Sequence, residues 1–224
     1  MMDRRMKCRI IVGLLMGLII YSCAQRTTKD VLQLEKGENQ QLEAKSRLLI
    51  DHGGYRGSGY TDSLGTNYNL RVNPITITNG RTIPIQVQIA FSKEYDYPSA
   101  YGDEQFKVFP LPKEWAADRT TDSQFKILFD KLPNFIDKPS LNETVEPGEK
   151  LVLAIGTLYP KPGETWSVVP NELFAHSNGG VFPTCDWNMK EDPSSNPEVA
   201  LGLKLNFVGG CTIIPCGQIS YPES

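Results

Sequence analysis

Apolar and polar side chains alternate with a period of two over residues 83–92, where Ile, Val and Phe occupy every second position. This spacing predicts a β-strand with one face buried and the other in water. Residues 200–207 alternate in the same way, and the glycines at 209–210 favour a turn that lets residues 211–219 run back beside them. Residues 150–159 are apolar on both faces, which predicts an internal strand.

The junction between these strands indicates how they are distributed. A two-residue hairpin at Asn79-Gly80 would pair Ile77 with Thr82. Because paired residues share a face, one strand's isoleucines would then point into water. The pattern therefore favours a longer connection, or a chain that crosses to a facing sheet as in immunoglobulin-like sandwiches.

A second turn supports the same fold class. Residues 146–149 (EPGE) fit a type II turn, and the phrase PGEKLVLAIG resembles one in immunoglobulin-like and related bacterial sandwich modules. We expect a mostly β fold, namely a two-sheet antiparallel β-sandwich of seven to nine strands with one short α-helix. The helix is predicted over residues 122–132, where apolar residues recur at helical spacing, with Asp122 as N-cap and Pro133 as the stop.

Three further segments have weaker patterns. Residues 51–67 contain five glycines but neither GxGxxG nor a phosphate-binding loop, so we expect a mobile loop. The His-Gly-Gly at its start resembles the oxyanion strip of some lipases, but no GxSxG nucleophile motif follows. Residues 166–169 are predicted to form a short strand and residues 172–176 a helical turn.

Residues 1–23 have the parts of a bacterial export signal. Four basic residues precede residues 10–20, which are uncharged and shorter than the roughly 20 residues that cross a bilayer. The segment ends at Ile20-Tyr21-Ser22-Cys23, which resembles the lipobox of bacterial lipoproteins. The resemblance implies a signal peptide over residues 1–22 and acyl chains such as palmitate on Cys23. An ordinary signal peptide with a chance cysteine is the alternative.

The same resemblance implies a position in the cell envelope, with the membrane as a partner through the lipid anchor. Ala24, rather than an aspartate, favours the outer membrane, with the domain facing the periplasm or the surface. Residues 23–46 are polar and are expected to form a flexible tether, and residues 47–224 a single domain. The chain has a formal net charge of −3, with four basic residues in the signal, which argues against a nucleic-acid partner.

Three cysteines follow the lipobox, and an exported chain meets an oxidising compartment. We expect at most one internal disulfide, joining Cys185 to Cys211 or Cys216. A disulfide between Cys211 and Cys216, which would close a short loop, is the third possibility. There is no CxxC pair and there are two histidines, so neither a metal site nor a cofactor is expected. His176, Cys185 and Asp186 would supply a Cys-His-Asp constellation, but the residues around Cys185 resemble no nucleophile motif.

Residues 93–116 hold the densest cluster of aromatic and acidic side chains. Flat aromatic faces beside carboxylates suit a glycan, which needs stacking and hydrogen-bond acceptors. The candidate ligand-binding residues are Tyr95, Tyr97, Tyr101 and Trp115. The alternative is that these aromatic side chains cap the sandwich in a loop fixed by prolines.

Two classes of function follow. The first is a non-catalytic binding or assembly module for a glycan or an envelope protein. The second is a cell-envelope hydrolase of the glycosidase kind, using carboxylates such as Asp96, Asp103 or Glu104, or His176. No catalytic motif or metal-ligand spacing occurs in the sequence, which favours the binding module.

Overall fold

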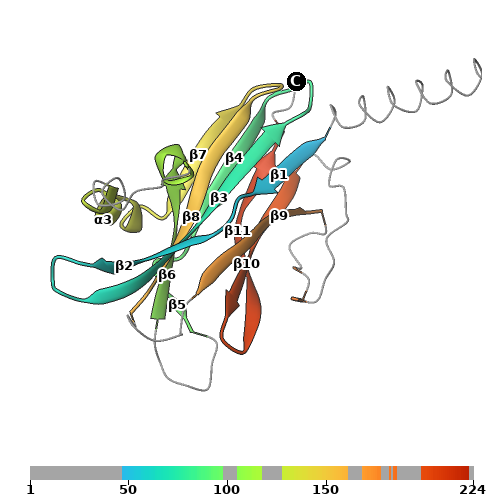
Figure 1. The fold of residues 1–224 in the computed structure, drawn as a ribbon. Coiled ribbons are helices and arrows are strands. Elements are labelled where there is room, and N and C mark those ends of the chain that lie inside the picture. Colours follow the sequence, from blue (N-terminus) through green and yellow to red (C-terminus); the bar gives the residue numbers. More distant parts are fainter. Residues whose placement is uncertain are drawn as a thin grey trace, which may run out of the picture. The chain divides into compact units, whose positions relative to one another are not determined.

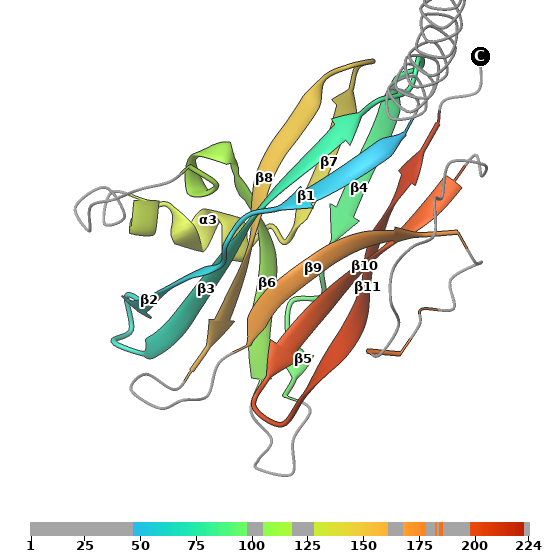
Figure 2. The same cartoon turned by 45° about the vertical axis from the view of Figure 1, so that its right-hand side comes forward.

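The computed structural model describes residues 47–97, 105–117, 128–160, 168–177, 182, 184–185 and 198–221. The predicted signal peptide, Cys23 and the tether lie outside the described residues. The chain forms two antiparallel sheets there, as Figures 1 and 2 show. This confirms a mostly β, sandwich-like fold. The described residues form eleven strands, more than the seven to nine expected.

The first sheet has the order β1-β3-β8-β6-β5, and β2 pairs with a second part of β3. Its strands are β1 (Leu48–His52), β2 (Arg56–Thr61), β3 (Asn67–Asn79), β5 (Tyr95–Asp96), β6 (Gln105–Pro112) and β8 (Lys150–Tyr159). The second sheet has the order β7-β4-β11-β10-β9. Its strands are β4 (Ile85–Ala90), β7 (Ser140–Val145), β9 (Val169–His176), β10 (Glu198–Phe207) and β11 (Gly210–Ser220).

The chain crosses between the sheets after β3, which is the second of the two alternatives that the register argument left open. β3 belongs to the first sheet and β4 to the second, so both keep their isoleucines in the core. The predicted internal strand is β8, which lies between β3 and β6. The turn before it has Gly148 at φ +79° and a hydrogen bond from the Glu149 N–H to the Glu146 carbonyl, as a type II turn requires.

Two hydrophobic clusters lie on opposite faces of the first sheet. Ile75 and Ile77 of β3 face the second sheet and join the main core. Leu70 and Val72 of the same strand face outward, where they pack with Trp115 at the end of η1 (Lys113–Trp115) and with residues around α3 (Leu132–Ile136). Figure 1 shows α3 beside the first sheet. This part of the sheet is therefore buried on both faces.

Three local predictions were wrong. Pro133 lies in the first turn of α3 rather than ending a helix, because proline's missing N–H costs nothing there. Residues 118–127 lie outside the described residues. Residues 172–176 belong to β9 and form no helical turn. The glycine-rich residues 51–67 are mostly strand, since β2 pairs with β3 along its whole length.

Candidate functional site

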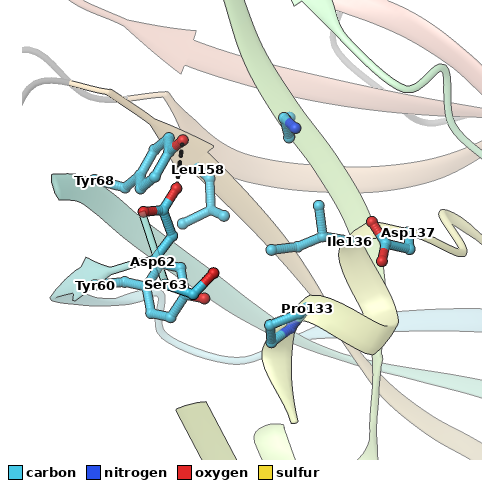
Figure 3. Close-up of a pocket in the computed structure, with 9 residues that line it drawn as sticks. Tyr60, Asp62, Ser63, Tyr68, Pro133, Ile136, Asp137 and Leu158 are labelled. Carbon is cyan, nitrogen blue, oxygen red and sulfur yellow. Dashed lines mark hydrogen bonds between the residues drawn. The ribbon is translucent and has the colours of Figure 1, made fainter. Parts of the chain in front are cut away.

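A cavity of about 150 Å³ lies between the tip of the β2–β3 hairpin and α3, on the outer side of the first sheet. We call it the hairpin cavity. Figure 3 shows the hairpin residues on one side and the α3 residues on the other. The residues that line it are Tyr60, Asp62, Ser63, Tyr68, Lys107, Pro133, Ile136, Asp137 and Leu158.

Asp62 organises the hairpin side of the cavity. Its Oδ1 accepts hydrogen bonds from the backbone N–H groups of Leu64 (2.9 Å) and Thr66 (2.8 Å). Gly65 completes the turn at φ +83°, a conformation that favours glycine. The sequence Asp-Ser-Leu-Gly thus folds as an Asx-type turn, which fixes the carboxylate at the rim of the cavity.

Two tyrosines extend this side inward. The Tyr68 hydroxyl donates to Asp62 Oδ2 at 3.3 Å, the bond drawn in Figure 3. Tyr60 is buried and packs edge-on against Phe129, with ring centroids 5.8 Å apart. Burial, and then the negative charge of Asp62, raise the pKa of both tyrosines above the usual 10.0. Both phenols are therefore neutral hydrogen-bonding groups at physiological pH.

The remaining lining combines an apolar floor with charged groups. Leu158 of β8 and Ile136 of α3 supply apolar surface, and Asp137 follows the end of α3. Lys107 of β6 also lines the cavity, with its Nζ 3.6 Å from Glu94 Oε1. The arrangement can hold a small ligand against apolar surface and hydrogen-bond its polar groups.

The aromatic residues predicted to bind a ligand do not form one surface. Tyr97 is 5% exposed and packs in the main core against Tyr159, with ring centroids 4.9 Å apart. Trp115 is 1% exposed and belongs to the cluster on the other face of the first sheet. Tyr95 is half-buried and stacks on Phe106 at 5.5 Å.

The prediction of one aromatic binding surface is therefore wrong for Tyr97 and Trp115. Burying these large side chains removes much apolar area from water, so they serve as core. Tyr101 lies outside the described residues.

Cys185, the cysteine considered as a nucleophile, is part of a disulfide. Cys185 is joined to Cys211, with Cα atoms 6.2 Å apart, and Cys216 is a free, buried thiol. A disulfide sulfur offers no thiolate, so the Cys185-centred Cys-His-Asp constellation is excluded. His176 is buried on β9, and Asp186 lies outside the described residues. Burial raises the pKa of the Cys216 thiol.

The remaining acidic and histidine side chains considered for catalysis make contacts within the fold or lie outside the described residues. Asp96 is exposed on β5 and accepts a hydrogen bond from Gln105 Nε2 at 3.1 Å. Asp103 and Glu104 lie outside the described residues. His52 Nε2 lies 3.0 Å from the backbone N and 2.9 Å from the backbone O of Leu173 on β9. It therefore links the edges of the two sheets.

Within the described ranges, no three His, Cys, Asp or Glu side chains gather as a metal site would require. In the same ranges no helix has the length and apolar character to cross a bilayer. No family model, curated protein or solved structure matches the chain.

Reasoning from the sequence missed the hairpin cavity. The available signal was Tyr60 and Tyr68, which flank a glycine-containing turn headed by Asp62. Tyrosines at equal distances from a turn face each other across a hairpin, as the Tyr60–Tyr68 pairing does.

Proposed function

We propose that this chain is a lipid-anchored envelope protein whose β-sandwich binds a glycan or protein partner without converting it, and that the hairpin cavity is the ligand site. The anchor is Cys23, on the strength of the basic and apolar run that precedes it and the lipobox-like residues 20–23. The outer membrane is the proposed destination. Under this proposal the lipid holds the protein at the membrane and the sandwich presents the cavity.

The observation that carries the binding role is the composition of the hairpin cavity. Tyrosine side chains, apolar floor residues, two carboxylates and one ammonium group converge on a small volume. Sugars are recognised by such combinations, because their C–H faces pack on apolar or aromatic surface while their hydroxyls need polar partners. About 150 Å³ is below the ~300 Å³ typical of drug-sized ligands. The expected ligand is one sugar ring or one side chain of a partner.

A glycan array probed with the full chain in a sugar-free detergent tests this role. Tyr68→Ala removes the ring and the hydroxyl, whereas the matched Tyr68→Phe removes only the hydroxyl. We expect glycan binding by the wild type, a strong loss in Tyr68→Ala and a smaller loss in Tyr68→Phe. Gln105→Ala should bind as the wild type does, because Gln105 does not line the cavity. If the wild type binds no glycan, a protein remains as the proposed partner. Equal binding by wild type and Tyr68→Ala would refute the cavity as the glycan site.

A hydrolase is the second candidate, because Asp62 and Asp137 line the same cavity. Glycosidases of most families use two carboxyl groups flanking the scissile bond. Asp62 is less suited than Asp137 to act as a catalytic carboxylate, because it accepts three hydrogen bonds within its own hairpin. Release of reducing sugar from a bound glycan by the wild type, abolished in Asp137→Asn, would favour hydrolysis. Binding without turnover would favour the module.

The anchor needs a separate test. Growth with a clickable fatty acid should label the wild-type protein, and Cys23→Ala should lose the label. Cys23→Ala also removes the proposed cleavage site, so this variant should keep residues 1–22, and its measured mass should include them. Labelling that persists in Cys23→Ala would refute lipidation at this residue.

A further inference from the structure

The outward face of the second sheet carries two rows of side chains that cross its strands, which we call the amide face. In an antiparallel sheet, paired residues share a face. One row crosses all five strands: it begins at His176, which is buried beside Phe182, and continues through the more accessible Ala200, Gln218, Gln88 and Asn142. The next row contains Glu198, Ser220, Gln86 and Thr144. Their neighbours Val87, Ile219 and Val199 point inward into the core.

Hydrogen bonds between neighbouring strands hold these side chains in place. Gln218 Nε2 donates to Gln88 Oε1 at 3.4 Å and to Glu198 Oε1 at 3.3 Å. Gln86 Nε2 donates to Asn142 Oδ1, and the Thr144 hydroxyl donates to Gln86 Oε1 at 2.8 Å. A side-chain amide can make about four hydrogen bonds. The network therefore orients the amides and leaves them capacity for a ligand.

The amide face is hollowed where the long row reaches β9, β10 and β11. A cavity of about 200 Å³ is lined there by His176, Ser177, Glu198, Val199, Ala200, Gly217 and Gln218. Glycine is required at position 217, which has φ +144° and where a Cβ atom would lie 1.9 Å from the Gln88 carbonyl oxygen. The small side chain of Ala200 leaves room at the surface, while Gln218 and Glu198 supply polar groups around it.

The composition of the two rows selects among ligand classes. They contain no Lys or Arg and one carboxylate, so they offer little attraction for an anionic ligand. They contain no Trp, Tyr or Arg, the residue types that dominate protein–protein binding energy. Amide and hydroxyl groups that both donate and accept match the hydroxyls of an uncharged sugar chain. The accessible positions from Ala200 to Asn142 span three strand spacings of about 4.8 Å, or about 14 Å, long enough for a short oligosaccharide.

We propose that the amide face is a second ligand site, which binds a neutral polysaccharide along the two rows and seats one sugar unit in the cavity at Ala200 and Gly217. Exposure of a sheet face to solvent is enough to explain why its residues are polar, but it does not explain the other features of this face. The near absence of charge, the fixed amides and the hollow beside Ala200 point to a ligand. This site is separate from the hairpin cavity, which lies on the outer side of the first sheet.

Affinity electrophoresis of the full chain, in a non-ionic detergent without sugar headgroups, tests the proposal. The gels contain dextran, a soluble β-1,3-glucan or a mannan. We expect at least one of these to retard the wild type, and Gln88→Ala/Gln218→Ala to weaken that interaction by about tenfold or more. Gln105→Ala, an amide on the first sheet, and Tyr68→Ala, in the hairpin cavity, should stay within about twofold of wild type.

A second variant guards against misfolding of the double variant. Ala200→Trp keeps every amide and fills the hollow, so it should also abolish retardation while its melting temperature stays near that of the wild type. The proposal is overturned if none of the three polysaccharides retards the wild type, or if Ala200→Trp is retarded as strongly as the wild type. Loss of retardation in Tyr68→Ala alone would also overturn it, because binding would then belong to the hairpin cavity.

Discussion

Asn79 should be among the most sensitive positions in the domain, although it is a polar residue remote from both cavities. It lies at the end of β3, where the chain leaves the first sheet, and is 0% exposed. Its Nδ2 donates to the backbone carbonyls of Ile83 and Val145, each at 2.9 Å, and its Oδ1 accepts from the Arg81 N–H at 3.0 Å. One side chain thus holds together the end of β3, the approach to β4 and the end of β7.

Asn79→Ala removes all three bonds and leaves their backbone partners without this side chain. A hydrogen bond of this kind contributes on the order of 1 kcal/mol net, so the expected loss in the free energy of unfolding is about 3 kcal/mol. For a domain of this size that lowers the melting temperature by about 6–12 °C. Asn79→Asp should be worse at neutral pH, because a buried carboxylate would face two carbonyl oxygens.

Circular dichroism during heating measures these differences, with Asn142→Ala as the matched control. Asn142 is an exposed amide on β7, so its removal should shift the melting temperature by no more than about 2 °C. The reasoning is refuted if Asn79→Ala melts as close to the wild type as the control does. It is also refuted if Asn79→Asp is more stable than Asn79→Ala at pH 7.

Three further predictions concern covalent and ionisable groups. Cys185→Ser breaks the disulfide to Cys211, whose 26-residue separation corresponds to about 3.5 kcal/mol of loop-closure entropy; thermal unfolding with and without reductant measures it, and an unchanged melting temperature contradicts it. Cys216 is buried with a raised pKa, so mass spectrometry should find its peptide alkylated by iodoacetamide only in denaturant; rapid labelling of the folded protein contradicts its burial. Asp62→Asn should lower the pKa of Tyr68 in an ultraviolet titration without restoring 10.0, because burial is the larger cause. Since the folded state favours the neutral phenol, the contribution of Tyr68 to stability is present below pH 10 and is lost above it. An unchanged titration of Tyr68 in Asp62→Asn would contradict the electrostatic effect of Asp62 on this phenol.

Much of the strand pattern was predictable because its signal is local. The alternation in residues 83–92 and 200–207 and the apolar run of residues 150–159 correspond to β4, β10 and β8. Each period follows from a strand's own pleat and the burial of one or both faces. The absence of a tight hairpin after β3 was also predictable, since register forbids one between two strands whose isoleucines must share the core. Register did not decide between a longer connection and the observed crossing to the second sheet.

Other features depended on contacts that a single stretch of sequence does not contain. β2 (RGSGYT) has almost no apolar residues and is a strand because β3 extends far enough to pair with it. Trp115 is buried because the segment around α3 covers the outward face of the first sheet. The choice between two disulfide partners depends on which face of β11 meets the core. Cys216 points into the core on the same face as Ile214, whereas Cys211, five residues earlier, lies on the other face, opposite Asn206 at the hairpin end.

The contact of His52 with Leu173 has a consequence for self-association. A sheet edge exposes backbone N–H and C=O groups that can pair with a strand from another molecule, which is a common start of aggregation. β9 is the last strand of its sheet, and Nε2 of His52 makes a hydrogen bond to Leu173 at that edge, accepting from its N–H or donating to its C=O according to the tautomer. Asn73 of β3 also donates from Nδ2 to the Asn171 carbonyl of β9 at 2.7 Å, so two side chains from the first sheet protect an edge of the second. Replacing His52 with Ala should expose that edge to intermolecular pairing.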